Sequence, residues 1–184
     1  MKLFDQFLRF WRVSIALKHL PEDANSIFDI GCDDGFLLKK FQFKDFQLDG
    51  CDSRLSILPI GKRSKLHKGF FPAVMIKAKP NKYDAIFSLA VFEHFTDNDL
   101  KDTAKTVSKM LKPKGRLIVT VPHPLVDKII DVLQFLRIMD GTAIEEHHEF
   151  DPKSLPQLFS ESLQCTKHKK FQLGLNNLFV FERL

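Results

Sequence analysis

Three histidines in this sequence follow predicted strands and could act as general bases. His94 comes after the apolar segment 83–89, His123 comes after the segment 116–122, and His147 lies in a later loop. In an open parallel sheet, ligands bind beyond the carboxyl ends of the strands, so all three imidazoles could reach one cleft. Imidazole titrates near neutral pH and can take a proton from an attacking hydroxyl group. The histidines therefore predict a site of proton removal at this edge of the sheet.

A glycine turn near the start of the chain could hold a cofactor. The apolar run 27–30 is typical of a buried parallel strand, and Gly31 and Gly35 follow it directly. The apolar spacing over 36–41 predicts a helix after the turn, an arrangement that lets backbone N–H groups approach a ligand. The spacing is G-x-x-x-G after Asp29, whereas a dinucleotide-binding turn reads G-x-G-x-x-G. This difference disfavours an NAD-linked enzyme.

The elements that position these residues follow from hydrophobic spacing and capping residues. An amphipathic helix is predicted within residues 1–20, and a strongly apolar helix over 129–138. Capping boxes are predicted at Thr96 with Asp99 and at Ser154 with Gln157. Further strands are predicted over 46–52, 65–71, 83–89, 116–122, 163–171 and 177–181.

Three segments resemble the class I S-adenosylmethionine-dependent methyltransferases. Asp29, Gly31 and Gly35 match their motif D-x-G-x-G-x-G, although Asp33 stands at the middle glycine. The segment 83–94 is similar to the "F-D-x-I-x-S" strand and "E-H" pair of the small-molecule branch, and 111–117 is similar to "L-K-P-G-G-x-L". The resemblance implies an α/β fold: a Rossmann-like doubly wound sheet of about seven strands, mostly parallel with an antiparallel terminal hairpin, and helices on both faces.

The resemblance also implies the site. Asp52, about 20 residues after Gly31, would accept hydrogen bonds from the ribose hydroxyls of S-adenosyl-L-methionine, and the segment 68–72 would supply an aromatic wall for adenine. The expected cofactor-binding residues are Asp29, Gly31, Cys32, Asp33, Gly35, Asp52, Ser53, Phe70, Phe71, Ser88, Leu89 and Ala90. The expected catalytic residues are His147, His123 and His94, with His147 ranked first because Phe150 follows it by three residues, as in the family.

Composition fits one soluble domain over residues 1–184, with 123–162 as a substrate-side cover. The three cysteines form no C-x-x-C pair, and no signal peptide or membrane span is recognisable, so a cytoplasmic location is expected. The net charge of +5 is spread along the chain. The N-terminal helix could pack on the domain or cover the cofactor pocket, or it could lie on a membrane surface.

The expected activity is methyl transfer to a small-molecule, glycan or lipid acceptor, at oxygen. The segment 146–184 resembles bacterial methyltransferases of cell-surface glycan and lipid synthesis. The alternative is a non-catalytic domain whose cofactor binding is weakened by Asp33. A nucleic-acid acceptor is disfavoured, because no N-P-P-[FY] signature follows the strand 83–89. No metal is expected, because the cluster 145–148 has no third ligand at a suitable spacing.

Overall fold

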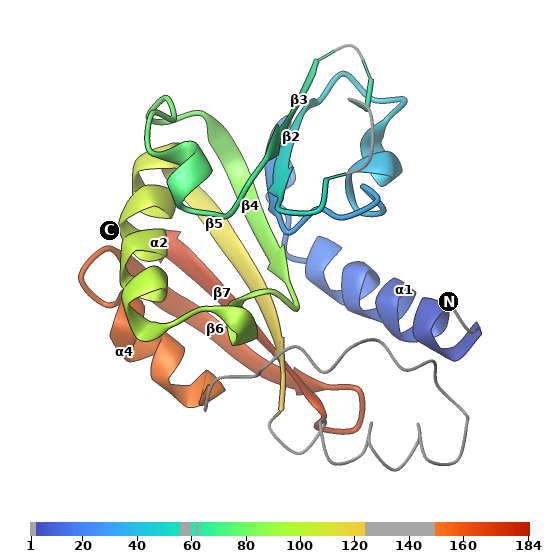
Figure 1. Cartoon of the computed structure of the whole chain (residues 1–184). Helices are drawn as coiled ribbons and strands as arrows, with labels where there is room; N and C mark the ends of the chain where they lie inside the picture. The colour runs from blue at the N-terminus through green and yellow to red at the C-terminus, as the bar shows by residue number, and fades with distance from the viewer. Residues whose placement is uncertain (1–2, 56–59, 62, 124–149) are drawn as a thin grey trace.

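A seven-stranded sheet forms the centre of the molecule (Figure 1). The computed structural model describes residues 3–55, 60–61, 63–123 and 150–184. The sheet order is β3-β2-β1-β4-β5-β7-β6. The strands are β1 Ser26–Ile30, β2 Gln47–Asp52, β3 Ser64–Lys68, β4 Tyr83–Leu89, β5 Leu111–Pro122, β6 Leu163–Phe171 and β7 Asn176–Arg183. β1 to β5 run parallel, whereas β7 is antiparallel to both β5 and β6. The predicted fold class is therefore confirmed.

Helices cover both faces of the sheet, because alternate residues of each strand point to opposite sides. On one face, α2 (Asp97–Met110) and α4 (Leu155–Phe159) pack against a core that includes Phe28 and Phe181. On the other face, α1 (Leu3–Leu17) packs through Ala16 against a second core that includes Ile27. Figure 1 shows α2 and α4 on the side of the sheet away from α1. None of the helices described here is long and apolar enough to cross a membrane.

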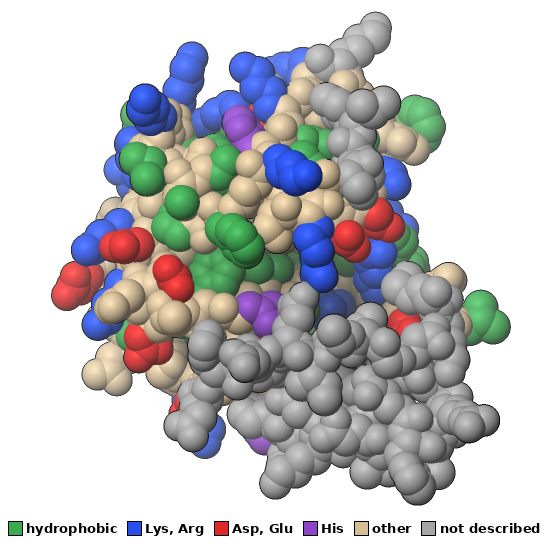
Figure 2. Space-filling model, viewed as in Figure 1, with side chains coloured by type: hydrophobic (Ala, Val, Ile, Leu, Met, Phe, Trp, Pro, Cys, Tyr) green, Lys and Arg blue, Asp and Glu red, His purple; other side chains and the backbone are tan. Residues whose placement is uncertain are grey.

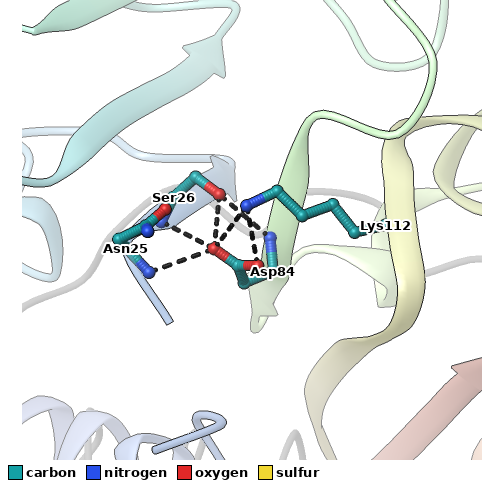
Figure 3. A network of polar contacts seen from close by, with 4 residues as sticks. All are labelled: Asn25, Ser26, Asp84 and Lys112. Atoms are coloured by element: carbon teal, nitrogen blue, oxygen red, sulfur yellow. Dashed lines mark hydrogen bonds and ion pairs between the residues drawn. The ribbon is translucent and has the colours of Figure 1, made fainter. Parts of the chain in front are cut away.

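Two carboxylates, one half-buried and one fully buried, join the strands at the end of the sheet opposite the strand termini that carry the histidines. Asp84 accepts hydrogen bonds from the backbone N–H groups of Asn25 and Ser26, each at 3.0 Å, and from the Ser26 hydroxyl at 2.6 Å (Figure 3). The Lys112 ammonium lies 2.8 Å from the Asp84 carboxylate. Burial alone would raise the pKa of Asp84, but these hydrogen bonds and this charge outweigh it and hold the pKa below its ordinary value. The network fixes the start of β1 to β4 and β5.

Asp49 forms the second network, within β2. Its fully buried carboxylate accepts hydrogen bonds from the Tyr83 hydroxyl at 2.7 Å and from the Lys65 backbone N–H at 2.8 Å, and it is paired with Lys82. Since a buried carboxylate is tolerated only with such partners, Asp49 ties β2 to the neighbouring strand β3 and to the start of β4. The carboxyl end of β2, where Asp52 stands, is positioned as a result.

Two local predictions were wrong. The segment after Gly35 forms only the 3₁₀ turn η1 (Leu38–Phe41), because one short turn already buries Leu37, Leu38 and Phe41 and no apolar residue continues a helical stripe on that face. Ser154 does not cap α4 with its side chain, which instead donates to the Asp151 carbonyl at 2.8 Å.

The physical reason for the missing cap is that Ser154 lies in the preceding 3₁₀ turn η4 (Pro152–Ser154) and has helical backbone angles, whereas an N-cap residue is extended. The other capping box, Thr96 with Asp99, is present in full at the start of α2. The predicted helix over 129–138 lies outside the described residues.

Candidate cofactor and acceptor cavity

A cavity of about 1010 Å³ opens at the carboxyl ends of β1, β2 and β4, with α1 along one side. It extends to Pro122 at the end of β5 and to the turn between β6 and β7. Of the residues predicted to bind the cofactor, the cavity is lined by Asp29, Gly31, Cys32, Asp33, Asp52, Ser53, Phe70, Phe71, Leu89 and Ala90. Figure 2 shows this side of the molecule, where hydrophobic side chains gather at the centre and basic side chains towards the upper edge.

The glycine turn brings backbone atoms against the cavity. Gly31 has a φ of +72°, and a Cβ there would lie 2.4 Å from the Val91 Cγ2 atom. The N–H groups of Gly31 and Cys32 donate to the Cys51 carbonyl at 2.9 and 3.1 Å, which fixes the turn to the end of β2. A side chain at position 31 would therefore be strained and would displace Val91, another cavity residue.

Asp52 connects the turn to the end of β2. One carboxylate oxygen accepts a hydrogen bond from the Asp33 N–H at 3.0 Å, and the other accepts one from the Arg54 N–H at 2.7 Å. Each oxygen has a further lone pair, so the carboxylate can still accept hydrogen bonds from a ligand in the cavity.

Asp29 is 4% exposed at the wall of the cavity. Its burial raises the pKa to about 8, an effect that Arg9 opposes and that Asp52 adds to. The carboxyl group is therefore largely protonated at neutral pH in the unliganded protein. A cationic ligand in the cavity would favour its ionised form.

An ion-pair cluster between α1 and the glycine turn was not anticipated from the sequence. The Arg9 guanidinium is hydrogen-bonded to both Asp34 carboxylate oxygens, lies 3.8 Å from the Asp33 carboxylate, and stacks 4.6 Å from the Phe36 ring centroid. Burial alone would raise the pKa of Asp34, but the hydrogen bond and charge of Arg9 outweigh it and lower the pKa. The only sequence signal was an arginine on the helix and two adjacent acids in the turn, 25 residues apart.

Phe70 and Phe71 contribute an aromatic wall where the sequence predicted one. Both line the cavity; Phe70 is 73% exposed, whereas Phe71 is 5% exposed and packs against the Phe28 ring. β3 ends at Lys68, three residues before the predicted end, and Gly69 with a φ of +146° turns the chain towards the cavity.

Two residues predicted to contact the cofactor lie behind the cavity surface. Ser88 is fully buried in β4, because its side chain points into the protein and away from the cavity. Gly35, with a φ of +73°, closes the turn because its N–H donates to the Cys32 carbonyl. Neither is among the cavity-lining residues of the described chain. Leu89 and Ala90, which follow Ser88, form this part of the wall.

The three candidate bases differ in position. His94 ends the 3₁₀ turn η3 (Phe92–His94) after β4, is exposed, and lines the cavity. His123 follows β5, where its backbone N–H donates to the Leu175 carbonyl at 2.8 Å, and its side chain is not among the lining residues of the described chain. His147 lies outside the described residues, together with the neighbouring Glu145, Glu146 and His148.

Replacing Asp33 with glycine is expected to leave the turn intact. Asp33 has a φ of +44°, its N–H rather than its side chain bonds Asp52, and its side chain is 72% exposed. Affinity for S-adenosylhomocysteine, measured calorimetrically, should stay the same or rise as a negative charge is removed from the cavity. A loss of affinity greater than about tenfold, or about 1.4 kcal/mol, would instead show that the Asp33 carboxylate contacts the ligand.

Known proteins and a protein-family model are similar to this chain. A model of the methyltransferase domain family matches residues 3–163. A mouse tRNA (carboxymethyluridine(34)-5-O)-methyltransferase, ALKBH8, is 26% identical over 111 residues, which is 60% of this chain but only 16% of that protein. The chain thus spans about a sixth of the length of this curated relative.

Solved structures share the fold at low identity. The PH0226 protein of Pyrococcus horikoshii is 14% identical with a TM-score of 0.74, covering 97% of this chain and 92% of that one. A TehB-like methyltransferase of Corynebacterium glutamicum is 12% identical with a TM-score of 0.65, covering 98% and 97%. The Burkholderia thailandensis 1,6-didemethyltoxoflavin-N1-methyltransferase with bound S-adenosylhomocysteine is 16% identical with a TM-score of 0.65, covering 94% and 76%.

Proposed function

Because this chain belongs to the methyltransferase domain family, we propose that it methylates an oxygen atom of a small-molecule, glycan or lipid acceptor. The methyl donor in this proposal is S-adenosylmethionine, which is supported by the match to a methyltransferase domain model and by the fold shared with methyltransferases. The observation that carries the proposal is a large cavity, lined at one end by the glycine turn and Asp52 and elsewhere by many apolar side chains. Such a cavity can hold a cofactor and a small acceptor side by side.

The residues at the glycine-turn end fit the cofactor. The absent Cβ of Gly31 leaves room beside Val91, and Asp52 presents a carboxylate that can accept hydrogen bonds from ribose hydroxyls. The exposed face of Phe70 would cover the adenine ring. When bound, S-adenosylmethionine supplies an electrophilic methyl group on a sulfonium centre.

The protein itself must align the acceptor with the methyl group and remove the acceptor's proton. The acceptor oxygen must be aligned with the methyl group, and apolar walls from α1, Val91 and Phe95 would exclude water from it. An alcohol or phenol acceptor must also lose a proton, for which we assign His147 the role of base, with His94 at the cavity wall and His123 after β5 as the other candidates.

The cofactor assignment is tested by titration calorimetry with the Asp52→Ala variant. The wild-type protein should bind S-adenosylhomocysteine more tightly than NAD. The variant should lose about 1.5–3 kcal/mol of binding free energy, since hydrogen bonds to a charged group are lost. Asp102→Ala on the exposed surface of α2 is the matched control and should bind normally. Tighter binding of NAD than of S-adenosylhomocysteine would contradict the assignment.

A tRNA acceptor is the second candidate, and one observation favours it. The matched segment of the mouse protein belongs to an enzyme named for oxygen methylation of a carboxymethyluridine in tRNA. This match weakens the sequence-based argument against nucleic acid. Incubation with labelled S-adenosylmethionine separates the two: label in tRNA supports the second candidate, and label only in phenols, hydroxylated lipids or nucleotide sugars supports the first.

A further inference from the structure

The half of the cavity away from the glycine turn has an apolar, aromatic wall. It is formed by the first turns of α1, by Phe95 after β4, and by Leu175 before β7. Phe7 and Trp11 on α1 both line it, and their rings are in tilted contact with centroids 5.7 Å apart. This half therefore suits a ligand with an apolar body.

Arg12 lines the same cavity from the middle of α1. It lies on the same side of the helix as Arg9, one turn further on, but its surroundings differ. Arg9 is bonded to Asp34 and close to Asp33, whereas the Nε atom of Arg12 is buried and has no hydrogen-bond partner in the described part of the chain. A buried guanidinium nitrogen without a partner is costly, and a bound ligand would supply the missing acceptor.

The charges that act on Arg12 differ from those that act on Arg9. Burial lowers its pKa, the attraction of Glu93 opposes this, and the repulsion of Arg9 adds to it. Glu93 is 5% exposed and comes from η3, directly after β4. The carboxylates of the glycine turn act on Arg9 instead. Arg12 is therefore influenced by the carboxylate of Glu93 and not paired with the carboxylates of the glycine turn.

A chain of hydrogen bonds holds this part of α1 in place. The Asn176 Nδ2 atom donates to the Gln172 Oε1 atom at 2.6 Å, and the Gln172 Nε2 atom donates to the Leu8 carbonyl at 3.0 Å. Leu8 is one helical turn before Arg12, so the β6–β7 turn fixes the helix beside the arginine. The Oδ1 atom of Asn176 is also buried and without a hydrogen-bond partner among the described residues, and it could accept a bond from a ligand hydroxyl.

We propose that Arg12 binds an anionic group of the methyl acceptor, so that the acceptor is an acid: an apolar body carrying a carboxylate or a phosphate. The planar guanidinium can form two parallel hydrogen bonds with either group. The apolar body lies against Phe7, Trp11 and Phe95. This inference rests on the proposed function, because it takes this half of the cavity as the acceptor site.

The test measures binding rather than turnover, on protein saturated with S-adenosylhomocysteine. The carboxylate arm compares 4-hydroxybenzoate with the neutral 4-hydroxybenzamide, and the phosphate arm compares phenyl phosphate with phenol. We expect the wild-type complex to prefer the anion at least tenfold in one arm, which identifies the group. Arg12→Gln should abolish that preference, and Arg12→Lys should retain part of it. Lys40 is not among the cavity-lining residues, although its ammonium stacks on Phe10 and on the cavity-lining Phe36, and Lys40→Gln should leave the preference unchanged.

Three results would overturn the proposal: no preference for the anion in either arm, a preference that persists in Arg12→Gln, or a selective loss of cofactor affinity. In the last case Arg12→Gln would weaken the binding of S-adenosylhomocysteine but not of 5′-methylthioadenosine, which lacks the carboxylate. Arg12 would then bind the carboxylate of the cofactor. Thermal melts show whether Arg12→Gln folds. If it does not fold, the proposal is tested by the anion preference of Arg12→Lys and by competition between inorganic phosphate and the anionic probe in the wild-type protein. Failure of the wild-type protein to bind S-adenosylhomocysteine would refute the proposed function separately.

Discussion

Replacing Asp29 with asparagine is expected to stabilise the unliganded protein at pH 8 and to change the pH dependence of its stability. The pKa of Asp29 is raised by burial from 3.8 to about 8 in the folded chain. Between these values the folded state holds a proton that the unfolded state has released, so the free energy of unfolding falls as pH rises. The slope is about 1.4 kcal/mol per pH unit and levels off above the folded pKa.

Asparagine is nearly isosteric with aspartate and carries no charge, so Asp29→Asn should lack this slope. Urea unfolding of both proteins at pH 5, 6, 7 and 8 measures it, with the variant gaining stability relative to the wild type at each step. Asp23→Asn in the exposed loop before β1 is the control and should follow the wild-type curve. Parallel pH curves for the wild type and Asp29→Asn would show that Asp29 is ionised in the folded protein.

Because Asp29 changes its protonation state near neutral pH, cofactor binding is expected to be coupled to proton release. A sulfonium or ammonium group bound near Asp29 would lower its pKa again, so binding at pH 7 should release up to one proton. Calorimetric titrations of S-adenosylmethionine in phosphate and in Tris, which differ in ionisation enthalpy, count the protons released. Asp29→Asn should release fewer. Equal release from both proteins would remove Asp29 from the linkage.

The second large effect is expected at His147. If this side chain removes the acceptor proton, His147→Ala should slow turnover by about 10²–10⁴-fold while affinity for S-adenosylhomocysteine is unchanged. The assignment rests on the sequence, with one link to the structure: Phe150, three residues later, packs against the hydrophobic core beside α2 and α4. Turnover is measured with an acceptor from a screen of phenols, hydroxylated lipids and nucleotide sugars.

Two further variants separate the candidate bases. His94→Ala should reduce turnover less, because His94 is expected to shape the cofactor end of the cavity rather than remove the proton. His123→Ala should have a small effect, since its backbone N–H bond to Leu175 remains in the variant. Full activity in His147→Ala with none in His123→Ala would move the base to the loop after β5. An acid acceptor that is methylated on its own carboxylate would need no base, and His147→Ala would then be active.

The sequence by itself determined the strands and the half of the cavity that lies along them. Ile27, Phe28 and Ile30 form a buried strand because a short apolar run has few other stable positions, and Gly31 follows where only a residue without Cβ fits beside Val91. Asp52 was found from its distance along the chain, because a parallel β-α-β unit brings successive strand ends to one edge. β6 has the predicted bounds, 163–171. These features depend on the spacing of residues along the chain, which the hydrophobic pattern of the sequence shows directly.

Only the tertiary structure showed which residues lie opposite the half of the cavity that follows the strand ends. Arg9 meets Asp34 across 25 residues, Gln172 meets Leu8 across 164, and Arg12 is left without a partner for its Nε atom within the described chain. The spacing of residues along the chain could not say which of these groups would meet. The structure also showed that the helix expected after Gly35 is only η1, because one short turn already buries Leu37, Leu38 and Phe41. Side-chain pairing between distant segments is a property of how the elements pack, and so only the folded chain shows it.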